Sequence, residues 1–433
     1  MYLDEWAPPE RLAGWVFDAT ESLLDTVSDL DDDDSRWMAP YATIINPAIW
    51  EIAHAAWFAE WFVLRRLHGA APLMADVDAR YDSAAVPHIT RWQLAYPDPE
   101  TTRTYVRDVG AALADRVKND QGLDSTAYYA LYAVMHHDAH TEALTYTRQT
   151  LGWSSPPELV REEHAAVPVS TGDLGVDGGR LLLGASRRQP FVMDNERWAH
   201  PVDVAPFSMA TTTVTMSQFA DFVADGGYQR ADLWSSQGWA WRQQVEAAMP
   251  VYWRAGDDGF EHRCFDRWRP VADDADLAMV HVNWWEADAW CRWAGRRLPR
   301  EAEWELAATT GADGVKQWWY PWGERDPVVT DAALDGTSGG VLPVGSKPDG
   351  DGPWGHRQLI GNVWEWTATT FEPYPHFEPD AYRDNSEPWF HTRKVLRGGS
   401  WATRSRYVRS TFRNYFEPDR RDVFAGFRTC ALA

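Results

Sequence analysis

Apolar residues recur with a helical period in four stretches of the first third of the chain. In the stretch 12–30 they return every three or four positions, the spacing of one face of a helix. The next two stretches follow Asn-Pro at 46–47 and Asp-Pro at 98–99, which are common helix starts, and the last begins near residue 124. Four such helices predict a four-helix bundle.

The chain changes character after Gly152. A polar stretch rich in proline and glycine follows, and beyond it helical spacing is rare. We therefore expect two domains, at 1–155 and 156–433. The second is expected to hold short strands, such as 180–184 and 191–193. Three helices are expected there, at 216–225, 285–294 and 297–308. The chain is thus predicted to be an α+β protein, a helical bundle followed by an irregular, loop-rich α+β domain.

Histidines on the second and fourth predicted helices form a candidate metal site. His136 and His140 are four residues apart, so their side chains stack on one face of a helix. His54 shares its predicted inward face with several tryptophans and could supply a third imidazole. Three neutral imidazoles suit iron, zinc, copper or nickel, so the ligands do not select the metal. The alternative is a buried helix with incidental histidines, and His137 is expected beside the site or at the surface.

The composition narrows the range of functions. A net charge of −23 argues against binding to nucleic acids or anionic membranes, which attract basic proteins. We find no apolar stretch of membrane-spanning length and no export signal. Three cysteines without a CxxC pair fit a reducing compartment, and 27 tryptophans predict aromatic walls. We expect a cytoplasmic protein that acts on small molecules.

Four motifs of the second part resemble those of formylglycine-generating enzymes. They are RLPREAEWELAA at 297–308, LIGNVWEWT at 359–367, VLRGGSWAT at 395–403 and AGFRTCA at 425–431. The resemblance covers residues 168–433 and implies the formylglycine-generating-enzyme or sulfatase-modifying-factor fold, which is C-type-lectin-like. The first part, with WEIAHAAWF at 50–58 and HHDAH at 136–140, resembles a DinB-type four-helix bundle. In this order the two parts resemble the ergothioneine-biosynthesis sulfoxide synthases.

This resemblance implies a mononuclear non-haem iron enzyme. Fe(II) would be held by His54, His136 and His140, with O2 as co-substrate. The organic substrate would be hercynine, which is Nα-trimethylhistidine, and a chalcogen atom would be joined to a carbon of its imidazole. Iron supplies one-electron chemistry in such a site, while the protein supplies position.

Candidate binding and catalytic residues follow from the same resemblance. Asn414 and Tyr415 match an asparagine and an aromatic residue that contact hercynine, whose quaternary ammonium needs an aromatic surface. The alternative for both is the packing of a C-terminal strand. Tyr382 matches a proton-donating tyrosine, a role that suits a phenol because it stays protonated at neutral pH. Tyr374 is the competitor, with a structural turn as its alternative role.

Departures from the resemblance predict the chalcogen donor. The branch that uses γ-glutamylcysteine has paired arginines in the long connection of the bundle and an aspartate after the asparagine and aromatic. Here HITRW in the connection 69–97 offers Arg91 alone, and Phe416 replaces the aspartate. One guanidinium forks only one carboxylate, and a phenylalanine cannot pair with an ammonium. The segments 81–92, which we expect to be extended, and 412–431 resemble the selenoneine-synthase branch. We therefore expect a seleno-sugar donor at Arg91 and Phe416, with γ-glutamylcysteine or cysteine as the alternative.

Three interpretations from other classes stay open. A formylglycine-generating oxidase would need a pair of neighbouring cysteines, and only Cys430 lies near the C-terminus. A non-catalytic binding module is possible because lectin-like folds resemble the second part. A zinc thiol-transferase is possible because three histidines bind zinc well. The metal content of the purified protein separates the binding module from the metalloenzymes.

Overall fold

The computed structural model of the protein describes residues 3–119, 124–161, 172–316 and 319–432. The chain folds into two compact units. The first consists of Met1–Glu158 and Arg188–Phe191, and the second of Leu159–Arg187 and Val192–Ala433. The ranges 1–155 and 156–433 stay a prediction of the domain organisation.

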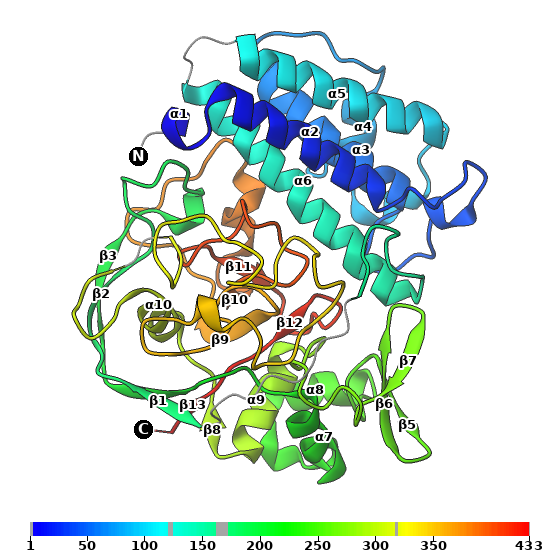
Figure 1. Cartoon of the computed structure of the whole chain (residues 1–433). Coiled ribbons are helices and arrows are strands. Elements are labelled where there is room, and N and C mark those ends of the chain that lie inside the picture. Colours follow the sequence, from blue (N-terminus) through cyan, green and yellow to red (C-terminus); the bar gives the residue numbers. More distant parts are fainter. Residues whose placement is uncertain (1–2, 120–123, 162–171, 317–318, 433) are drawn as a thin grey trace. The chain divides into compact units, whose positions relative to one another are not determined.

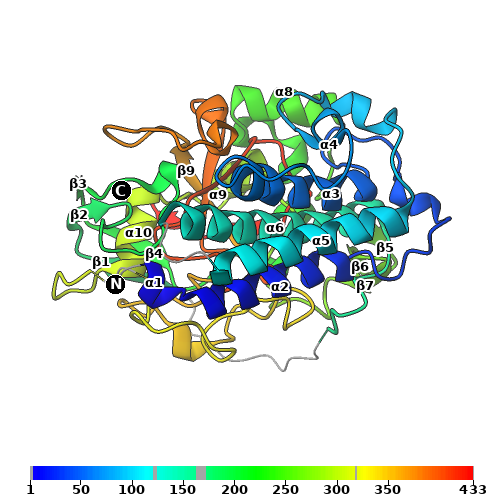
Figure 2. The ribbon, with the colours of Figure 1, turned by 90° about the horizontal axis from the view of Figure 1, so that it is seen from above.

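The first unit is helical. Its helices are α1 (Leu3–Trp6), α2 (Pro9–Asp25), α3 (Ala48–Ala59), α4 (Val77–Tyr81), α5 (Pro99–Asn119) and α6 (Asp124–Leu151). Helices α2 and α3 each pack against both α5 and α6, and the four lie side by side (Figures 1 and 2). The four predicted helices are therefore confirmed. Among the described residues, no helix combines the length and the apolar character that a bilayer span requires.

The most deeply buried of these helices is α3. All 12 of its residues are buried, because its sequence AIWEIAHAAWFA alternates alanine with large apolar side chains and has no polar face. It begins after Pro47, whose fixed φ suits a helix start. A π-helical turn, Glu60–Arg65, continues it. By contrast, α2 buries one stripe that includes Leu12, Val16 and Leu23.

The connection between α3 and α5 differs from expectation. Residues 81–92 are not extended: they contain the end of α4 and a 3-10 helix, His88–Trp92. Pro87 sets the backbone angle just before this 3-10 helix, so the chain turns instead of continuing straight. The turn folds Arg91 back toward α3, over the ring of Trp50.

In its described residues the second unit combines short strands with four helices. These strands form four small sheets, in the orders β1-β4-β13-β8, β11-β10-β9-β12, β2-β3 and β5-β6-β7. The strands are β1 (Asp173–Val176), β2 (Gly179–Leu183), β3 (His200–Val204), β4 (Phe207–Ala210), β5 (Trp253–Gly256), β6 (Gly259–Cys264), β7 (Arg267–Pro270), β8 (Arg296–Arg297), β9 (Trp364–Thr370), β10 (Lys394–Arg397), β11 (Asn414–Phe416), β12 (Ala425–Gly426) and β13 (Cys430–Ala431). The helices are α7 (Met216–Ala224), α8 (Ser236–Gln244), α9 (Trp284–Trp293) and α10 (Glu301–Thr309). The predicted α+β class is confirmed.

Most expected elements of this unit are present. The strand at 180–184 is β2, and the three helices are α7, α9 and α10. The strand predicted at 191–193 is wrong, because this buried apolar run leads into a 3-10 turn, Asp194–Glu196, and a short apolar run fits a buried loop as well as a strand. Helix α8 was not predicted, since Gly238 lowers the helix propensity of its sequence.

A buried ion network ties α10 to β10 and to the segment before β11. Glu301 accepts hydrogen bonds from Arg397 at 2.9 Å and from Arg413 at 2.7 Å and 3.1 Å. Glu305 accepts from Arg397 and from Lys316, each at 2.6 Å. The acidic residues of RLPREAEWELAA therefore act mainly as partners of buried cations.

Candidate metal centre and substrate residues

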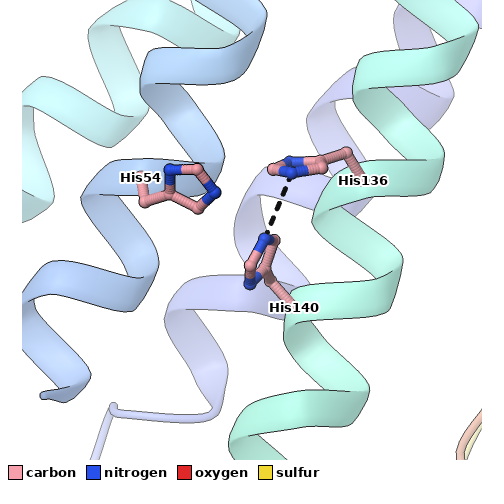
Figure 3. Close-up of side chains that lie close together, drawn as sticks. All are labelled: His54, His136 and His140. Atoms are coloured by element: carbon pink, nitrogen blue, oxygen red, sulfur yellow. Dashed lines mark hydrogen bonds between the residues drawn. The ribbon is translucent and has the colours of Figure 1, made fainter. Parts of the chain in front are cut away.

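Three imidazoles from two helices of the first unit point toward one another (Figure 3). His54 comes from α3, whereas His136 and His140 come from α6. One nitrogen of each ring lies within 4.8 Å of the others. The Nε2 atoms of His136 and His140 are 3.2 Å apart. The spacing of four residues thus places both rings on the side of α6 that faces His54.

Burial and one hydrogen bond define the state of His54. The residue is 2% exposed, and burial lowers the pKa of its imidazole to about 3, so the ring is neutral at physiological pH. Its Nδ1 lies 2.7 Å from the Tyr81 carbonyl oxygen, which only accepts, so Nδ1 carries the proton. Nε2 therefore offers a lone pair to a metal ion. The ring of Trp50 stacks on the imidazole at a centroid distance of 4.5 Å and restrains its orientation.

A buried carboxylate holds His140. Oε1 of Glu51 lies 2.5 Å from Nδ1 of His140, and Oε2 accepts a hydrogen bond from Nδ2 of Asn46, also at 2.5 Å. Burial by itself would raise the pKa of Glu51, but the charge and the hydrogen bond of His140, with smaller contributions from His54 and Asn46, lower this pKa overall. An ionised carboxylate only accepts, so Nδ1 of His140 donates, and in the neutral form of the ring Nε2 carries the lone pair.

Packing against an aromatic ring positions His136. Its imidazole stacks on Phe58 at a centroid distance of 4.1 Å, and burial together with the charge of His140 holds its pKa well below the ordinary value. Lone pairs on two Nε2 atoms 3.2 Å apart repel each other unless a proton or a cation lies between them. The three histidines therefore fit a divalent metal ion that accepts nitrogen ligands, iron included.

His137 does not join the three. It is 4% exposed, and its Nδ1 donates to the carbonyl oxygen of Ala133 at 2.8 Å, one turn back on the same helix. It lines a small, largely apolar pocket with Val16 and Leu113. The expectation of a surface position for His137 is wrong, because the opposite face of α6 is also buried in the bundle.

Arg91 is already engaged within the first unit. Its Nη1 donates to Oδ1 of Asn46 at 2.6 Å, and its guanidinium lies over the ring of Trp50, 3.8 Å from the centroid. Asn46 donates in turn to Glu51. Arg91 is thus linked through one amide side chain to the carboxylate that holds His140.

Tyr382 lies half-buried in a turn of the second unit that is anchored on Asp194. The carboxylate of Asp194 accepts from the backbone N–H of Asp380 at 3.2 Å, from Nδ2 of Asn385 at 2.8 Å and from Oγ of Ser386 at 2.7 Å. Burial raises the pKa of Asp194 in spite of these hydrogen bonds. One carboxylate therefore holds both ends of the turn that carries Tyr382.

The expected substrate residues Asn414, Tyr415 and Phe416 form β11, which pairs with β10. The Tyr415 hydroxyl donates to the carbonyl oxygen of Asn385, and its ring stacks on Phe371 at 4.0 Å. Burial raises the pKa of Tyr415 well above the ordinary value, and the neighbouring Tyr382 adds to this effect. Tyr415 and Tyr382 thus lie close together, and the hydroxyl of Tyr415 serves the turn that carries Tyr382.

Tyr374 and the cysteines have structural surroundings. Tyr374 is 6% exposed, and its hydroxyl donates to Glu301 at 3.3 Å inside the ion network. Cys264, Cys291 and Cys430 are free thiols, and burial raises the pKa of Cys430 to about 12. A thiol with so high a pKa is a weak nucleophile at neutral pH, which disfavours a formylglycine-type oxidation at Cys430.

Two residues of these sites escaped the analysis of the sequence. Glu51 stands three positions before His54, and a carboxylate one turn from a buried histidine on an otherwise apolar helix was a usable signal. Asp194 carried no such signal. Its hydrogen-bond partners in the turn are 186 to 192 residues away in the chain.

Comparisons with known proteins identify relatives of this chain. Residues 161–432 match the Sulfatase-modifying factor enzyme 1-like domain family, which confirms the fold expected for the second part. A hercynine oxygenase of Mycobacterium tuberculosis is 34% identical over 430 residues, which cover 97% of this chain and 98% of that protein. A hercynine oxygenase of Mycolicibacterium smegmatis is 33% identical over 411 residues, which cover 92% and 93% of the two chains. A formylglycine-generating enzyme of Streptomyces coelicolor is 32% identical over 323 residues, which cover 64% of this chain and 94% of that protein.

Proposed function

The chain belongs to the hercynine oxygenase family and is an oxidoreductase, and from this premise we propose that it is a mononuclear non-haem Fe(II) enzyme that uses O2 to join a chalcogen atom to the imidazole of hercynine. The observation that carries the proposal is the convergence of His54, His136 and His140, with their ligand nitrogens within 4.8 Å of one another. When bound, iron would supply the one-electron chemistry with O2 and hold the soft donor atom.

Backbone and side-chain groups of the protein would prepare this centre. The Tyr81 carbonyl and the Glu51 carboxylate fix the protons of His54 and His140 on Nδ1 and leave Nε2 for the metal. The stacked rings of Trp50 and Phe58 hold two of the imidazoles in place. Three protein ligands leave coordination positions for substrates.

We assign hercynine binding to Asn414 and Tyr415, and proton donation to Tyr382. Oδ1 of Asn414 accepts from the backbone N–H of Tyr415 at 2.8 Å, which leaves the amide N–H groups of Asn414 to bind a substrate acceptor such as a carboxylate. The ring of Tyr415 would meet the quaternary ammonium through its π-system, because its hydroxyl donates to Asn385.

The donor that we propose is a seleno-sugar. A dipeptide such as γ-glutamylcysteine carries two carboxylates and an ammonium, and its recognition needs guanidinium forks that are not already occupied. Arg91 already donates to Asn46 and covers Trp50. Phe416 offers the face of a ring in place of a carboxylate, and a sugar is bound by hydroxyl contacts and aromatic faces.

The alternative donor is γ-glutamylcysteine or cysteine. The variant Phe416→Asp bears on this choice. Residue 416 lies across the strand pair from Lys394, and the Arg420 guanidinium is 5.1 Å from the Phe416 ring centroid. A new aspartate at position 416 would therefore lie near cations. We expect Phe416→Asp to weaken use of the seleno-sugar without creating use of the dipeptide.

One experiment tests the function and the donor together. Protein loaded anaerobically with Fe(II) is mixed with O2 and hercynine. Separate reactions contain seleno-glucose, thio-glucose, cysteine or γ-glutamylcysteine as the donor, and the products are identified by mass spectrometry. We expect a coupled product with the highest kcat/KM for seleno-glucose. A preference for γ-glutamylcysteine would replace the donor and keep the reaction class. No coupled product with any donor would contradict the proposed function.

A further inference from the structure

The three histidines do not share one kind of support, and the difference singles out Glu51. The Nδ1 partner of His54 is a neutral backbone carbonyl, and His136 is supported by the Phe58 ring. The Nδ1 partner of His140, by contrast, is a carboxylate, which can carry a full charge. That partner, Glu51, is 5% exposed and stands on α3 one turn before His54. It therefore reaches the pair on α6 from the helix that carries the third imidazole.

Both oxygens of this carboxylate are committed. Oε1 faces Nδ1 of His140 and Oε2 faces the amide of Asn46, each at 2.5 Å. Oδ1 of Asn46 accepts from Arg91, so the amide cannot rotate without losing one of its two hydrogen bonds. The carboxylate is thus held in a single orientation, and it holds the imidazole of His140 in turn.

The charge of the site gives this contact a second role. Three neutral imidazoles bring no negative charge to a divalent cation, and the Arg91 guanidinium lies close by on Trp50. Such a concentration of positive charge in a partly buried site is costly unless an anion is near. The Glu51 carboxylate, which bonds to His140, lies where it can supply this negative charge.

We propose that Glu51 is a positioning residue of the metal centre: it orients Nε2 of His140 toward the metal and supplies the buried negative charge that offsets a divalent ion on three neutral imidazoles. This inference rests on the metal-binding role proposed for the histidines. Carboxylates that accept from ligand histidines typically contribute about 10- to 100-fold to metal affinity.

The test compares two substitutions of Glu51 with a matched substitution of Glu60. Glu60 is also buried and lies on the continuation of α3, but its oxygens accept from the Leu73 N–H and the Tyr105 hydroxyl instead of from a metal-site histidine. The affinities of wild type, Glu51→Ala, Glu51→Gln and Glu60→Gln for Fe(II) are measured anaerobically by competition with a chromogenic chelator. Co(II)-loaded samples give absorption spectra that report the geometry of the ligands, and circular dichroism checks folding.

We expect Glu51→Ala to weaken Fe(II) binding about 10- to 100-fold and to change the Co(II) spectrum. Glu51→Gln keeps an acceptor but removes the charge, so we expect a smaller loss, about 10-fold, with a spectrum closer to that of wild type. Glu60→Gln should bind metal as wild type does, even if it melts earlier. If Glu51→Ala does not fold, the affinity of Glu51→Gln decides.

The outcomes separate this inference from the proposed function. A wild-type protein that binds Fe(II) in a 1:1 ratio together with Glu51 variants of unchanged affinity would overturn the role of Glu51 and leave the metal centre standing. An equal loss in Glu60→Gln would also overturn it, because the effect would then belong to any buried carboxylate of the bundle. A wild-type protein that binds no Fe(II) would instead contradict the proposed function.

Discussion

The two groups of candidate residues are held in different ways. His54 and the pair on α6 stand on helices of 12 and 28 residues, and each ring is fixed by stacking or by a hydrogen bond to a buried partner. Tyr382 stands in a turn and Tyr415 on a strand of three residues. The Asp194 carboxylate holds the turn, and the Tyr415 hydroxyl links the strand to it. A helix keeps its shape when one contact is lost, because its backbone bonds are internal, whereas an irregular turn depends on each of its few long-range bonds.

The largest effect that we expect is the loss of bound metal when one of the three converging histidines is replaced, with the neighbouring His137 as the control. His54→Ala, His136→Ala and His140→Ala should each lose bound Fe(II) after anaerobic reconstitution, because two imidazoles do not hold the ion. His137→Ala should keep it, since that side chain bonds to Ala133 on another face of α6. Metal analysis by mass spectrometry gives the comparison. Equal loss in the His137 variant would show that the site depends on the packing of α6 rather than on three ligands.

The same contrast explains what could be predicted. The pairing of His136 with His140 follows from a spacing of four residues, and helix periodicity placed His54 on the inward face of α3, so local rules sufficed for this geometry. The turn that carries Tyr382 could be found only through a motif resemblance, because its shape is set by Asp194, 192 residues before Ser386. The strand expected at 191–193 failed for a related reason: apolar character predicts burial but does not choose a partner.

The second effect tests the two tyrosines of the second unit. Tyr382→Phe removes only the phenolic proton, so we expect metal content to stay and coupling to fall by about 10²- to 10⁴-fold, the usual contribution of a general acid. Tyr374→Phe removes a 3.3 Å hydrogen bond to Glu301, and should cost about 1 kcal/mol of stability while coupling continues. Product analysis and thermal unfolding of both variants give the answer. The reverse pattern would transfer the role of proton donor to Tyr374.

The third effect lies in the buried ion network. In Glu301→Gln the Arg413 guanidinium loses the carboxylate to which it bonds, whereas Arg397 loses one carboxylate and keeps Glu305. Both arginines are about 1% exposed or less, so we expect a loss of about 3–5 kcal/mol of stability. On the same helix, Glu303 pairs with Arg297, whose side chain is 30% exposed, and Gln keeps its bond to the Arg300 N–H. Glu303→Gln should cost less than about 1 kcal/mol. Urea unfolding measures both, and similar losses would mean that α10 depends on its N-terminal charge rather than on the buried network.

The smallest expected effect decides what the Tyr415 hydroxyl does. In Tyr415→Phe the ring stays stacked on Phe371, and only the bond to the Asn385 carbonyl is lost. Since that bond holds the turn that carries Tyr382, we expect about 1 kcal/mol less stability and a modest fall in kcat, with little change in KM for hercynine. A rise in KM without a change in kcat would show instead that the hydroxyl contacts the substrate.

The variant Asp194→Asn tests the same turn from its other partner. Asparagine has the size of aspartate but lacks the charge and one acceptor, so this variant should loosen the turn more strongly than Tyr415→Phe and should also lower kcat. If one of these two variants changes kcat and the other changes KM, the turn and the strand act separately. Asp194 alone would then hold the turn that carries Tyr382.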